Sequence, residues 1–284
     1  KNITVGICGK ALFYYNNDFS YRLIEWIEVL RNLGISKIFL YKSKCHKNIQ
    51  KVFDFYEKEG IVKVITFHYP PPIVQEGTFI RLMFCRLWSR NEKIEFWSVQ
   101  NIYINDCLLR NKDDFDYLGV MDSDEIPIMK NHQSLPEFLM YLRQRNNQPE
   151  SYFFKWKTFF RDLKSHTLLS NETDRSYIFN HNIRTKLNSK EAKVFETNGK
   201  TFYDTSQVTF AYPHKNLEII SNLVPSIELK TLSRDVAYMG HFTDHKCVKK
   251  EHCFDGNTEE ETALLPFREK VVQKMNEVLN ILKI

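Results

Sequence analysis

Residues 3–42 read ITVGICGKALFYYNNDFSYRLIEWIEVLRNLGISKIFLYK, and the class of fold follows from their pattern. The opening ITVGIC is an apolar, β-branched run ended by Gly9, which predicts a strand. The middle has Ser20 as a candidate N-cap, apolar residues at helical spacing and Gly34 as a candidate C′ residue, which predicts a helix. The closing ISKIFLYK predicts a second strand. Strand, helix and strand in this order predict a parallel pair joined by a right-handed crossover.

The alternation of helix and strand continues beyond this unit. Residues 48–60 have a helical pattern that Gly60 closes, and residues 61–69 predict a third strand, which three prolines then stop. A helix from about residue 95 to 110 precedes a fourth strand at 116–121. Strands that alternate with helices are typical of an α/β fold with a doubly wound, mostly parallel sheet.

The second half is richer in aromatic residues. Ser134 and Glu137 have the spacing of a capping box and predict the start of a helix. Further elements are predicted as strands at 151–160, 207–215 and 236–242 and as a largely amphipathic helix at 258–282. No internal repeat or clean linker divides the chain. We therefore predict one domain over residues 1–284, with a nucleotide-type half over about 1–130 and an aromatic-rich half, including the terminal helix, over about 131–284.

Length and composition describe an ordinary globular protein. The chain has 284 residues, of which 43% are hydrophobic, enough to bury one sizeable core. Its net charge of +5 is spread along the sequence without a long basic block, which disfavours a nucleic-acid partner. The sequence contains no apolar run of about 18 residues or more, so it shows neither a signal peptide nor a membrane span.

Cysteine usage points weakly to an oxidising compartment. The chain has six cysteines, an even number, and Asn-x-Ser/Thr sequons at Asn2 and Asn171. Both features favour the secretory pathway, with reduced thiols and chance sequons in a cytosolic protein as the alternative.

The segment CVKKEHC, residues 247–253, favours a disulfide that closes a short loop between its two cysteines. The alternative is a zinc site made by Cys247 and Cys253 with His245 and His252, although the spacing is not that of a standard finger. The pairing of the other cysteines stays open.

The stretch DYLGVMDSDEIPIM, residues 116–129, ends its apolar run in three closely spaced carboxylates, Asp122, Asp124 and Glu125. In open α/β sheets, ligands bind in the crevice outside the carboxyl ends of the strands, which is where these residues fall. Carboxylates this close repel one another unless a cation neutralises them, and oxygen ligands suit Mg²⁺ or Mn²⁺. The motif therefore predicts a metal and diphosphate site, with a solvated acidic turn as the alternative.

Four blocks of the sequence resemble glycosyltransferase family 92, and they occur in the family's order over most of residues 3–245. The blocks are VGICGKALFYYNNDFSYRLIEWIEVLRNLGISKIFLYKSK, VFDFYEKEGIVKVITF, QNIYINDCLLRNKDDFDYLGVMDSDEIPI and AYMGHF. Members of that family are similar in a first strand carrying Cys, a helix with Glu-Trp, an Asn-Asp-Cys triplet, an aspartate pair followed by Glu, and a late His-aromatic pair. Several spaced motifs that agree are more specific than any one of them.

The resemblance implies a GT-A fold, which is a Rossmann-like, mostly parallel sheet flanked by helices, here with an aromatic-rich acceptor side. It implies inverting transfer of galactose from UDP-galactose, with Mn²⁺, to a glycan acceptor. Animal members are similar to the β1,4-galactosyltransferase that modifies the core fucose of N-glycans, so a fucosylated N-glycan is the expected acceptor, whereas plant members extend β1,4-galactan. The chain is then expected in the Golgi lumen, as the soluble part of a type II membrane protein whose membrane segment lies outside this sequence. The polar Ser123 between the aspartates, and Phe242 where Tyr is commoner, leave the acceptor open.

The resemblance also implies roles for single residues. Asp124 would ligate the metal directly, Asp122 would hold the metal through water or the ribose, and His241 would be the third protein ligand. A structural histidine is the alternative for His241. Further donor contacts are expected at Cys8, Gly9, Lys10, Lys42, Asn105, Asp106 and Ser123. Solvated lysines and an Asn-Asp helix cap are the alternatives for the charged and amide members of this set.

Inversion also needs a general base that takes the proton of the acceptor hydroxyl, normally an Asp or Glu. The second half offers Asp204, Glu196, Asp235 and Asp244, and we favour Asp244 because it lies three residues after His241. Four aromatic residues could form a stacking platform for a sugar, although most are expected in the core: Trp156, Phe159, Phe160 and Tyr212. The pair Glu25-Trp26 is also expected in the core, with Trp26 beneath the first strand.

Two other classes of function fit the same kind of fold. One is a catalytically silent relative that binds glycans, which the presence of Asp122, Asp124 and His241 disfavours. The other is a nucleotidyltransferase, which the absence of a Gly-rich phosphate loop after the first strand disfavours.

Overall fold

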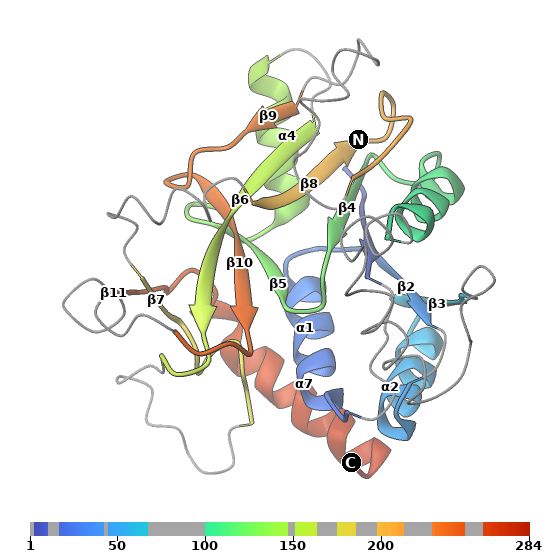
Figure 1. Cartoon of the computed structure of the whole chain (residues 1–284), viewed down its shortest axis with the longest axis vertical. Helices are drawn as coiled ribbons and strands as arrows, with labels where there is room; N and C mark the ends of the chain where they lie inside the picture. The colour runs from blue at the N-terminus through green and yellow to red at the C-terminus, as the bar shows by residue number, and fades with distance from the viewer. Residues whose placement is uncertain are drawn as a thin grey trace, which may run out of the picture.

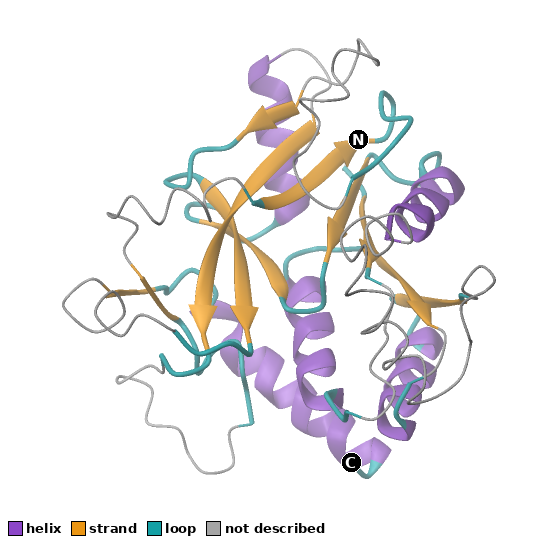
Figure 2. Cartoon of the chain, viewed as in Figure 1, coloured by secondary structure: helices purple, strands orange, loops and turns teal. Residues whose placement is uncertain are grey.

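Strands run through the middle of the molecule and helices lie around them (Figure 1, Figure 2). This computed structural model describes residues 3–10, 17–42, 45–67, 100–146, 151–163, 175–185, 198–212, 229–247 and 258–284. The strands of these segments join into a mixed sheet of 11 strands. The predicted α/β class, with a mostly parallel sheet flanked by helices, is confirmed.

The first half forms a block of four parallel strands. Their order is β3 (Val62–Thr66), β2 (Lys37–Lys42), β1 (Val5–Gly9) and β4 (Tyr117–Met121). The connecting helices are α1 (Ser20–Asn32) and α2 (Lys47–Lys58). Gly34 and Gly60 follow these helices with φ of 89° and 80°, the left-handed conformation that favours glycine. The sequence therefore predicted both helix ends correctly.

Side chains of the parallel strands alternate between two hydrophobic cores. Ile7 and Leu40 face the core formed with α1, α2 and the C-terminal helix. Cys8 and Phe39, their neighbours, face a second core formed with the helix at 100–111. Strands buried on both faces need helices on both sides, which is the arrangement expected for a parallel sheet. Trp26 is fully buried in the first core, as the sequence predicted.

The strands of the second half extend this sheet and return to its centre. β8 (Gly199–Asp204) pairs antiparallel with β4, and β6 (Ser151–Phe160) pairs antiparallel with β8. β10 (Ala237–Thr243) pairs parallel with β6 and antiparallel with β5 (Glu125–Met129). The short strands are β7 (Ile183–Thr185), β9 (Leu229–Thr231) and β11 (Thr258–Glu260). Because β10 lies beside β5, a segment late in the sequence reaches the end of β4.

Two helices of the second half pack in different places. α4 (Leu135–Asn146) packs on β5, and its Ser134 Oγ accepts the amide of Glu137 at 3.4 Å, one half of the predicted capping box. The short 3₁₀ helix η2 (Leu265–Phe267) leads into α7 (Arg268–Leu282), which packs on α1 and α2. The chain thus ends on the helices of its first half, although the sequence assigned the terminal helix to the second.

Three local predictions are wrong. Residues 207–212, the described part of a predicted strand, are a turn and irregular backbone, because the carboxylate of Asp204 accepts the amide of Ser206 at 3.0 Å and turns the chain. The terminal helix does not begin at residue 258: β11 pairs with β7 first, and η2, with Pro266 in its first turn, then precedes α7. Ser20 is the first residue of α1 and not its cap, since its own amide donates to Asp18 at 3.0 Å.

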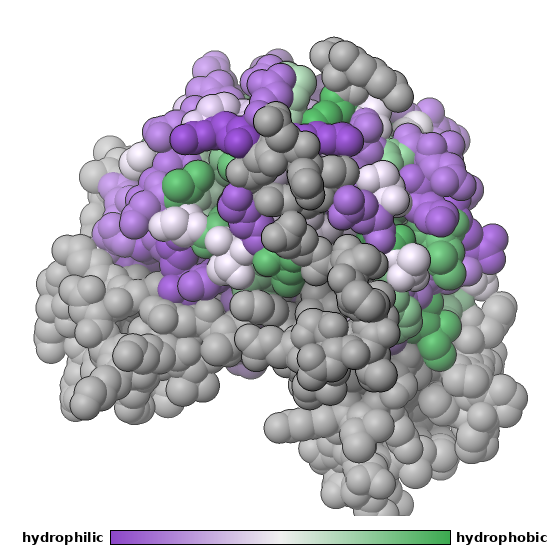
Figure 3. Space-filling model, turned by 90° about the horizontal axis from the view of Figure 1, so that it is seen from above, coloured by the Kyte–Doolittle hydropathy of each residue, from purple (hydrophilic) through white to green (hydrophobic). Residues whose placement is uncertain are grey.

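The helices and one face of the surface can be described by their hydropathy in the described segments. No helix there is long and apolar enough to cross a membrane. On the face drawn in Figure 3, hydrophilic residues prevail among those described, and hydrophobic ones stand in small separate groups.

Candidate active site

The acidic turn of residues 122–124 joins β4 to β5 at the carboxyl end of the parallel strands. Glu125 holds its backbone, since Oε2 of Glu125 accepts the amide of Asp122 at 2.7 Å and the Glu125 amide donates back to the Asp122 carbonyl at 3.1 Å. Glu125 is fully buried, and burial raises its pKa although the charge of Lys200 opposes the shift. The turn is thus shaped from inside by Glu125, while Asp122 and Asp124 stay partly exposed.

A buried lysine lies against this turn. The antiparallel register of β8 with β4 pairs Phe202 with Gly119, and two residues further on it brings Lys200 to the end of β4. The Lys200 side chain is fully enclosed, and its ammonium lies 3.3 Å from Oδ2 of Asp122 and 3.5 Å from Oε2 of Glu125. Burial alone would lower the pKa of Lys200, but the charges of these carboxylates raise it overall, so it stays protonated. The sequence analysis did not identify Lys200. The one feature that could have indicated it is a charged residue inside an otherwise strand-like run.

The end of β1 supplies a second lysine. The amide of Lys10 donates to the carbonyl of Met121 at 3.2 Å, and its ammonium lies 3.8 Å from Oδ2 of Asp122. Its side chain is 25% exposed, so a ligand can reach the ammonium, and the predicted phosphate contact stays a prediction. Packing explains why glycine occupies position 9, because a Cβ there would lie 2.5 Å from the side chain of Leu40.

His241 comes to the acidic turn from the second half. The register of β10 against β5 sets His241 opposite Glu125, and Nε2 lies 3.3 Å from Oδ2 of Asp124. Trp156 stacks on the imidazole with ring centroids 4.6 Å apart. Burial alone would lower the pKa of His241, but its hydrogen bond to Asp124 and the negative charges of the turn raise it above 6.5 overall. The late segment therefore folds back over the sheet edge, as the sequence predicted.

Arg22 of α1 binds the end of β10, just after His241 in the chain. Its guanidinium donates to the carbonyl of Phe242 at 2.9 Å, pairs with Asp244, and lies 3.8 Å from the ring centroid of Tyr177. Tyr177 in turn donates its hydroxyl to the carbonyl of Thr243 at 2.7 Å. Asp244, the favoured general base, is 68% exposed and held at the edge of the site by this group.

The other candidate bases lie elsewhere. Asp204 is buried opposite Tyr117, at the amino end of β4, where it caps a turn. Asp235 is 91% exposed and precedes β10, whose far end carries His241. Glu196 lies outside the described residues. Among the described candidates, Asp244 is the one that directly follows β10, the strand that carries His241.

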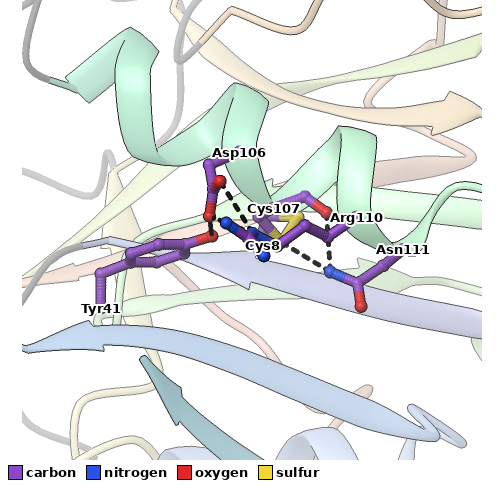
Figure 4. Close-up of a disulfide and its surroundings, with 6 residues drawn as sticks. All are labelled: Cys8, Tyr41, Asp106, Cys107, Arg110 and Asn111. Carbon is purple, nitrogen blue, oxygen red and sulfur yellow. Dashed lines mark hydrogen bonds and ion pairs between the residues drawn. A yellow bond between two sulfur atoms is a disulfide. The ribbon is translucent and has the colours of Figure 1, made fainter. Parts of the chain in front are cut away.

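The side chains at positions 105 and 106, where donor contacts are predicted, both bind other residues of the fold. Both residues lie inside a helix and not at its end. Asn105 clamps Ala211, donating to its carbonyl at 3.0 Å and accepting its amide at 2.8 Å. Asp106 accepts the hydroxyl of Tyr41 at 2.7 Å and pairs with Arg110 at 2.8 Å (Figure 4). These contacts hold the fold and correct the predicted position at a helix end, whereas contact of either side chain with a donor stays a prediction.

Cys8 is likewise a structural residue. Its sulfur bonds to Cys107, and both residues are buried between β1 and the helix at 100–111 (Figure 4). The Cys8 side chain is therefore not free to contact a nucleotide. Lys42, another predicted phosphate contact, donates to Gln50 at the start of α2. Ser123 lies partly exposed in the acidic turn, where a ligand can reach it.

Cys247 and two of the predicted platform residues can also be assigned to the fold or to the site. Cys247 is disulfide-bonded to a cysteine outside the described residues, so the proposed partner Cys253 is not tested, but a thiolate of Cys247 is not available for zinc. Phe159 is fully buried against Phe242 and belongs to the core. Trp156 is half-buried on His241 and is the aromatic residue of the predicted platform that lies at the site.

The side chains around the turn suit a divalent metal in their chemistry. Two aspartates and an imidazole offer the oxygen and nitrogen ligands that Mn²⁺ accepts, and the buried Oε1 of Glu125 has no hydrogen-bond partner among the described residues. As they stand, however, no three His, Cys, Asp or Glu side chains in the described segments are grouped closely enough to hold an ion. Asp122 faces Lys200 and Lys10, while Asp124 faces His241.

Comparison with known proteins gives one clear result. The model of Glycosyltransferase family 92 matches residues 3–280 of the chain. No curated protein was found to match it.

Solved structures match only distantly. S. aureus TarS has 10% identity and a TM-score of 0.45, over 85% of this chain and 37% of TarS. S. aureus TarS 1-349 in complex with UDP-GlcNAc has 10% identity and a TM-score of 0.44, over 99% of this chain and 65% of that one. Glucosyl-3-phosphoglycerate synthase from Mycobacterium tuberculosis has 11% identity and a TM-score of 0.37, over 88% and 74%. The chain spans less than two thirds of both TarS chains, and scores this low add nothing to the family match.

Proposed function

The chain belongs to glycosyltransferase family 92, and on this premise we propose that it is an inverting, metal-dependent glycosyltransferase that moves galactose from UDP-galactose to a glycan. The core fucose of N-glycans, joined through a β1,4 linkage, is the proposed acceptor. One observation carries the proposal: Asp122 and Asp124 lie at the carboxyl end of β4, and β10 brings His241 to within 3.3 Å of Asp124. Asp124 and His241, which are 117 positions apart in a family-matched chain, thus meet where a sheet of this class binds its ligand.

Each group has a distinct task in this proposal. Asp124 and His241 hold the divalent ion, and Asp122 completes the site directly or through water. The bound ion supplies Lewis-acid neutralisation of the charge that develops on the departing diphosphate. Lys10 lies at the end of β1 with an accessible ammonium and meets a phosphate oxygen as a point charge.

Asp244 is the proposed general base. It lies beyond the end of β10, is largely exposed, and can accept the proton of an acceptor hydroxyl that approaches from solvent. Arg22 pairs with this carboxylate and holds it in place at the end of β10. Trp156 supplies an aromatic ring next to His241, and the face of such a ring suits the apolar face of a sugar.

The lumen of the Golgi is the proposed compartment, reached as the soluble part of a type II membrane protein. The buried Cys8–Cys107 disulfide supports this, because disulfides persist in oxidising compartments. Microscopy of the tagged full-length protein with a Golgi marker tests it. A cytosolic distribution would contradict it.

A donor panel tests the reaction. Purified protein is incubated with UDP-galactose, UDP-glucose or UDP-GlcNAc and an array of N-glycans with and without core fucose, each in Mn²⁺ and in EDTA. We expect turnover that is highest with UDP-galactose on fucosylated glycans and that EDTA abolishes. Faster turnover of another UDP-sugar would reject the donor. Metal-dependent UDP binding without transfer to any acceptor would favour a catalytically silent glycan-binding relative, and consumption of a nucleoside triphosphate would favour a nucleotidyltransferase.

A further inference from the structure

Lys200 is a fully enclosed cation inside the group of carboxylates that the proposed function assigns to the metal. Its side chain has no exposed area, and its ammonium lies 3.3 Å from Asp122 and 3.5 Å from Glu125. A buried charge is tolerated only when it is paired, so the lysine and these two carboxylates depend on one another. Because β8 pairs with both β4 and β6, the sheet fixes the backbone that carries this enclosed side chain.

The two aspartates of the turn are drawn to different cations. Oδ2 of Asp122 faces Lys200 at 3.3 Å and Lys10 at 3.8 Å, whereas Oδ2 of Asp124 faces His241 at 3.3 Å. This division accounts for the absence, in the described segments, of three acidic or imidazole groups close enough to hold an ion. A metal ion that approaches Asp122 must compete with a fixed ammonium.

Counting charges gives the consequence for metal binding. Asp122, Asp124 and Glu125 can supply three negative charges, and Lys200 and Lys10 return two positive ones, so the group is close to neutral even with His241 uncharged. A divalent ion gains little from a nearly neutral group. A nucleoside diphosphate adds negative charge and can engage the accessible Lys10, which leaves the turn more attractive to the ion.

We propose that Lys200 makes metal binding depend on the nucleotide: it keeps the affinity of the empty turn for a divalent ion low, so that the ion binds tightly only together with a nucleoside diphosphate. The inference rests on the proposed function, because it takes Asp122 and Asp124 as the metal ligands. It adds a role for a residue that contacts neither sugar nor acceptor. Lys200 acts through Asp122 and is a positioning residue.

A matched pair of variants isolates the lysine. Glu125→Gln removes the buried acid that most needs Lys200, and Glu125→Gln with Lys200→Met removes the lysine from that same background without leaving Glu125 unpaired. Mn²⁺ binding without nucleotide is read from the electron spin resonance signal of free Mn²⁺. We expect the double variant to bind Mn²⁺ about tenfold or more tightly than Glu125→Gln, as a unit charge removed at this range allows. Equal or weaker binding would overturn the proposal.

The unmodified protein gives a second, independent readout, which can reject the proposal even if the double variant does not fold. Mn²⁺ titrated into wild type should bind about tenfold or more tightly in the presence of saturating UDP than in its absence. Lys10→Met is the comparison for an accessible lysine, and its effect on Mn²⁺ binding without UDP should be smaller than that of losing Lys200. Mn²⁺ affinity in wild type that does not change with UDP would contradict the inference.

These readouts use no sugar and no acceptor, so they are separate from the donor panel. Transfer from UDP-galactose without any coupling of Mn²⁺ and UDP would reject the inference and keep the proposed function. Coupled binding of Mn²⁺ and UDP without transfer to any acceptor would keep the inference and reject the proposed function.

Discussion

Glu25 and Glu125 are both fully buried carboxylates whose pKa burial raises to about 7, yet their surroundings differ in kind. Glu25, in the middle of α1, accepts hydrogen bonds from the hydroxyl of Ser176 and the amides of Tyr177 and Ile178, the latter two at 2.8 and 2.9 Å. Glu125 accepts one amide and otherwise faces a buried ammonium and two neighbouring aspartates. Burial and pKa are similar at the two positions, so neither property identifies the functional one.

The groups that contact each carboxylate distinguish the structural Glu25 from Glu125 at the candidate site. Neutral, directional donors from one short segment fix Glu25 in place, and none of them carries a charge that a metal or phosphate would compete for. The charges around Glu125 can exchange partners, because a metal or a phosphate competes with the same lysines and aspartates. We therefore expect changes near Glu125 to alter activity and metal binding, and changes at Glu25 to alter stability.

Asp124→Asn should have the largest effect and tests the Glu125 side of this comparison. The change removes one charge and keeps the size of the side chain, which is 35% exposed. We expect transfer at saturating Mn²⁺ to fall by about 100-fold or more, beyond the losses usual for groups that only support a ligand. The melting temperature should change little, because an exposed pair contributes little to stability. Initial rates and a thermal melt check both, and turnover near wild type would remove Asp124 from the metal site.

His241→Ala tests the residue that closes the same site from β10. We expect metal-dependent UDP binding to weaken and turnover to fall by about 10-fold to 100-fold. His245→Ala, four residues further along the chain, is the control and should matter much less. Full activity of His241→Ala at limiting Mn²⁺, together with loss in His245→Ala, would mean that the wrong histidine was chosen.

Acidic conditions should mimic the loss of His241. A histidine must be neutral to bind a metal, and the raised pKa of His241 means that protonation competes already above the usual value near 6.5. Transfer should therefore fall as the pH drops through this raised pKa, and higher Mn²⁺ should restore part of it. The pH profile of kcat/KM at low and high Mn²⁺ gives the measurement. A profile that does not shift with Mn²⁺ would argue against coordination by His241.

Glu25→Ala and Glu125→Gln form the direct contrast between the two regions. Glu25→Ala leaves several buried donors without an acceptor and should lower the free energy of unfolding by about 2–3 kcal/mol, while kcat changes by less than about threefold. Glu125→Gln should lower kcat by about tenfold with a smaller loss of stability, because it alters the turn that carries the aspartates. Urea unfolding and kinetics on both variants decide the matter. The opposite pattern would reverse the two assignments.

The sequence predicted what depends on local pattern. The β1–α1–β2 unit, the glycine ends of α1 and α2, and the position of the acidic turn all follow from periodicity and turn residues. It could not find Lys200, because the contact with Asp122 depends on the register of β8 against β4, between segments 78 residues apart. The same holds for Asn105, whose partner Ala211 is 106 residues away, and for Cys8, whose partner is 99 away. Pairings between distant segments are set by packing of the whole sheet, which a local pattern does not contain.

The smallest expected effect concerns the pH dependence of stability at Glu25. Burial raises the folded pKa of Glu25 from 4.5 to about 7, so between these values the folded protein binds more protons than the unfolded chain. Its contribution to stability is therefore full below the unfolded pKa and is lost as the pH rises through about 7. Glu25→Gln lacks this group, while Glu125 titrates in both proteins and cancels in the difference.

The free energy of unfolding of wild type, minus that of Glu25→Gln, should then fall by about 1.5 kcal/mol between about pH 5.5 and 7, given 1.36 kcal/mol for each unit of pKa shift. Urea unfolding of both proteins across this range measures it. A difference that stays level would mean that the donors from Ser176, Tyr177 and Ile178 hold Glu25 ionised throughout. In that case Glu25 would be a permanent charge stabilised by peptide groups, and the contrast with Glu125 would be sharper still, since only the carboxylate beside Lys200 would titrate.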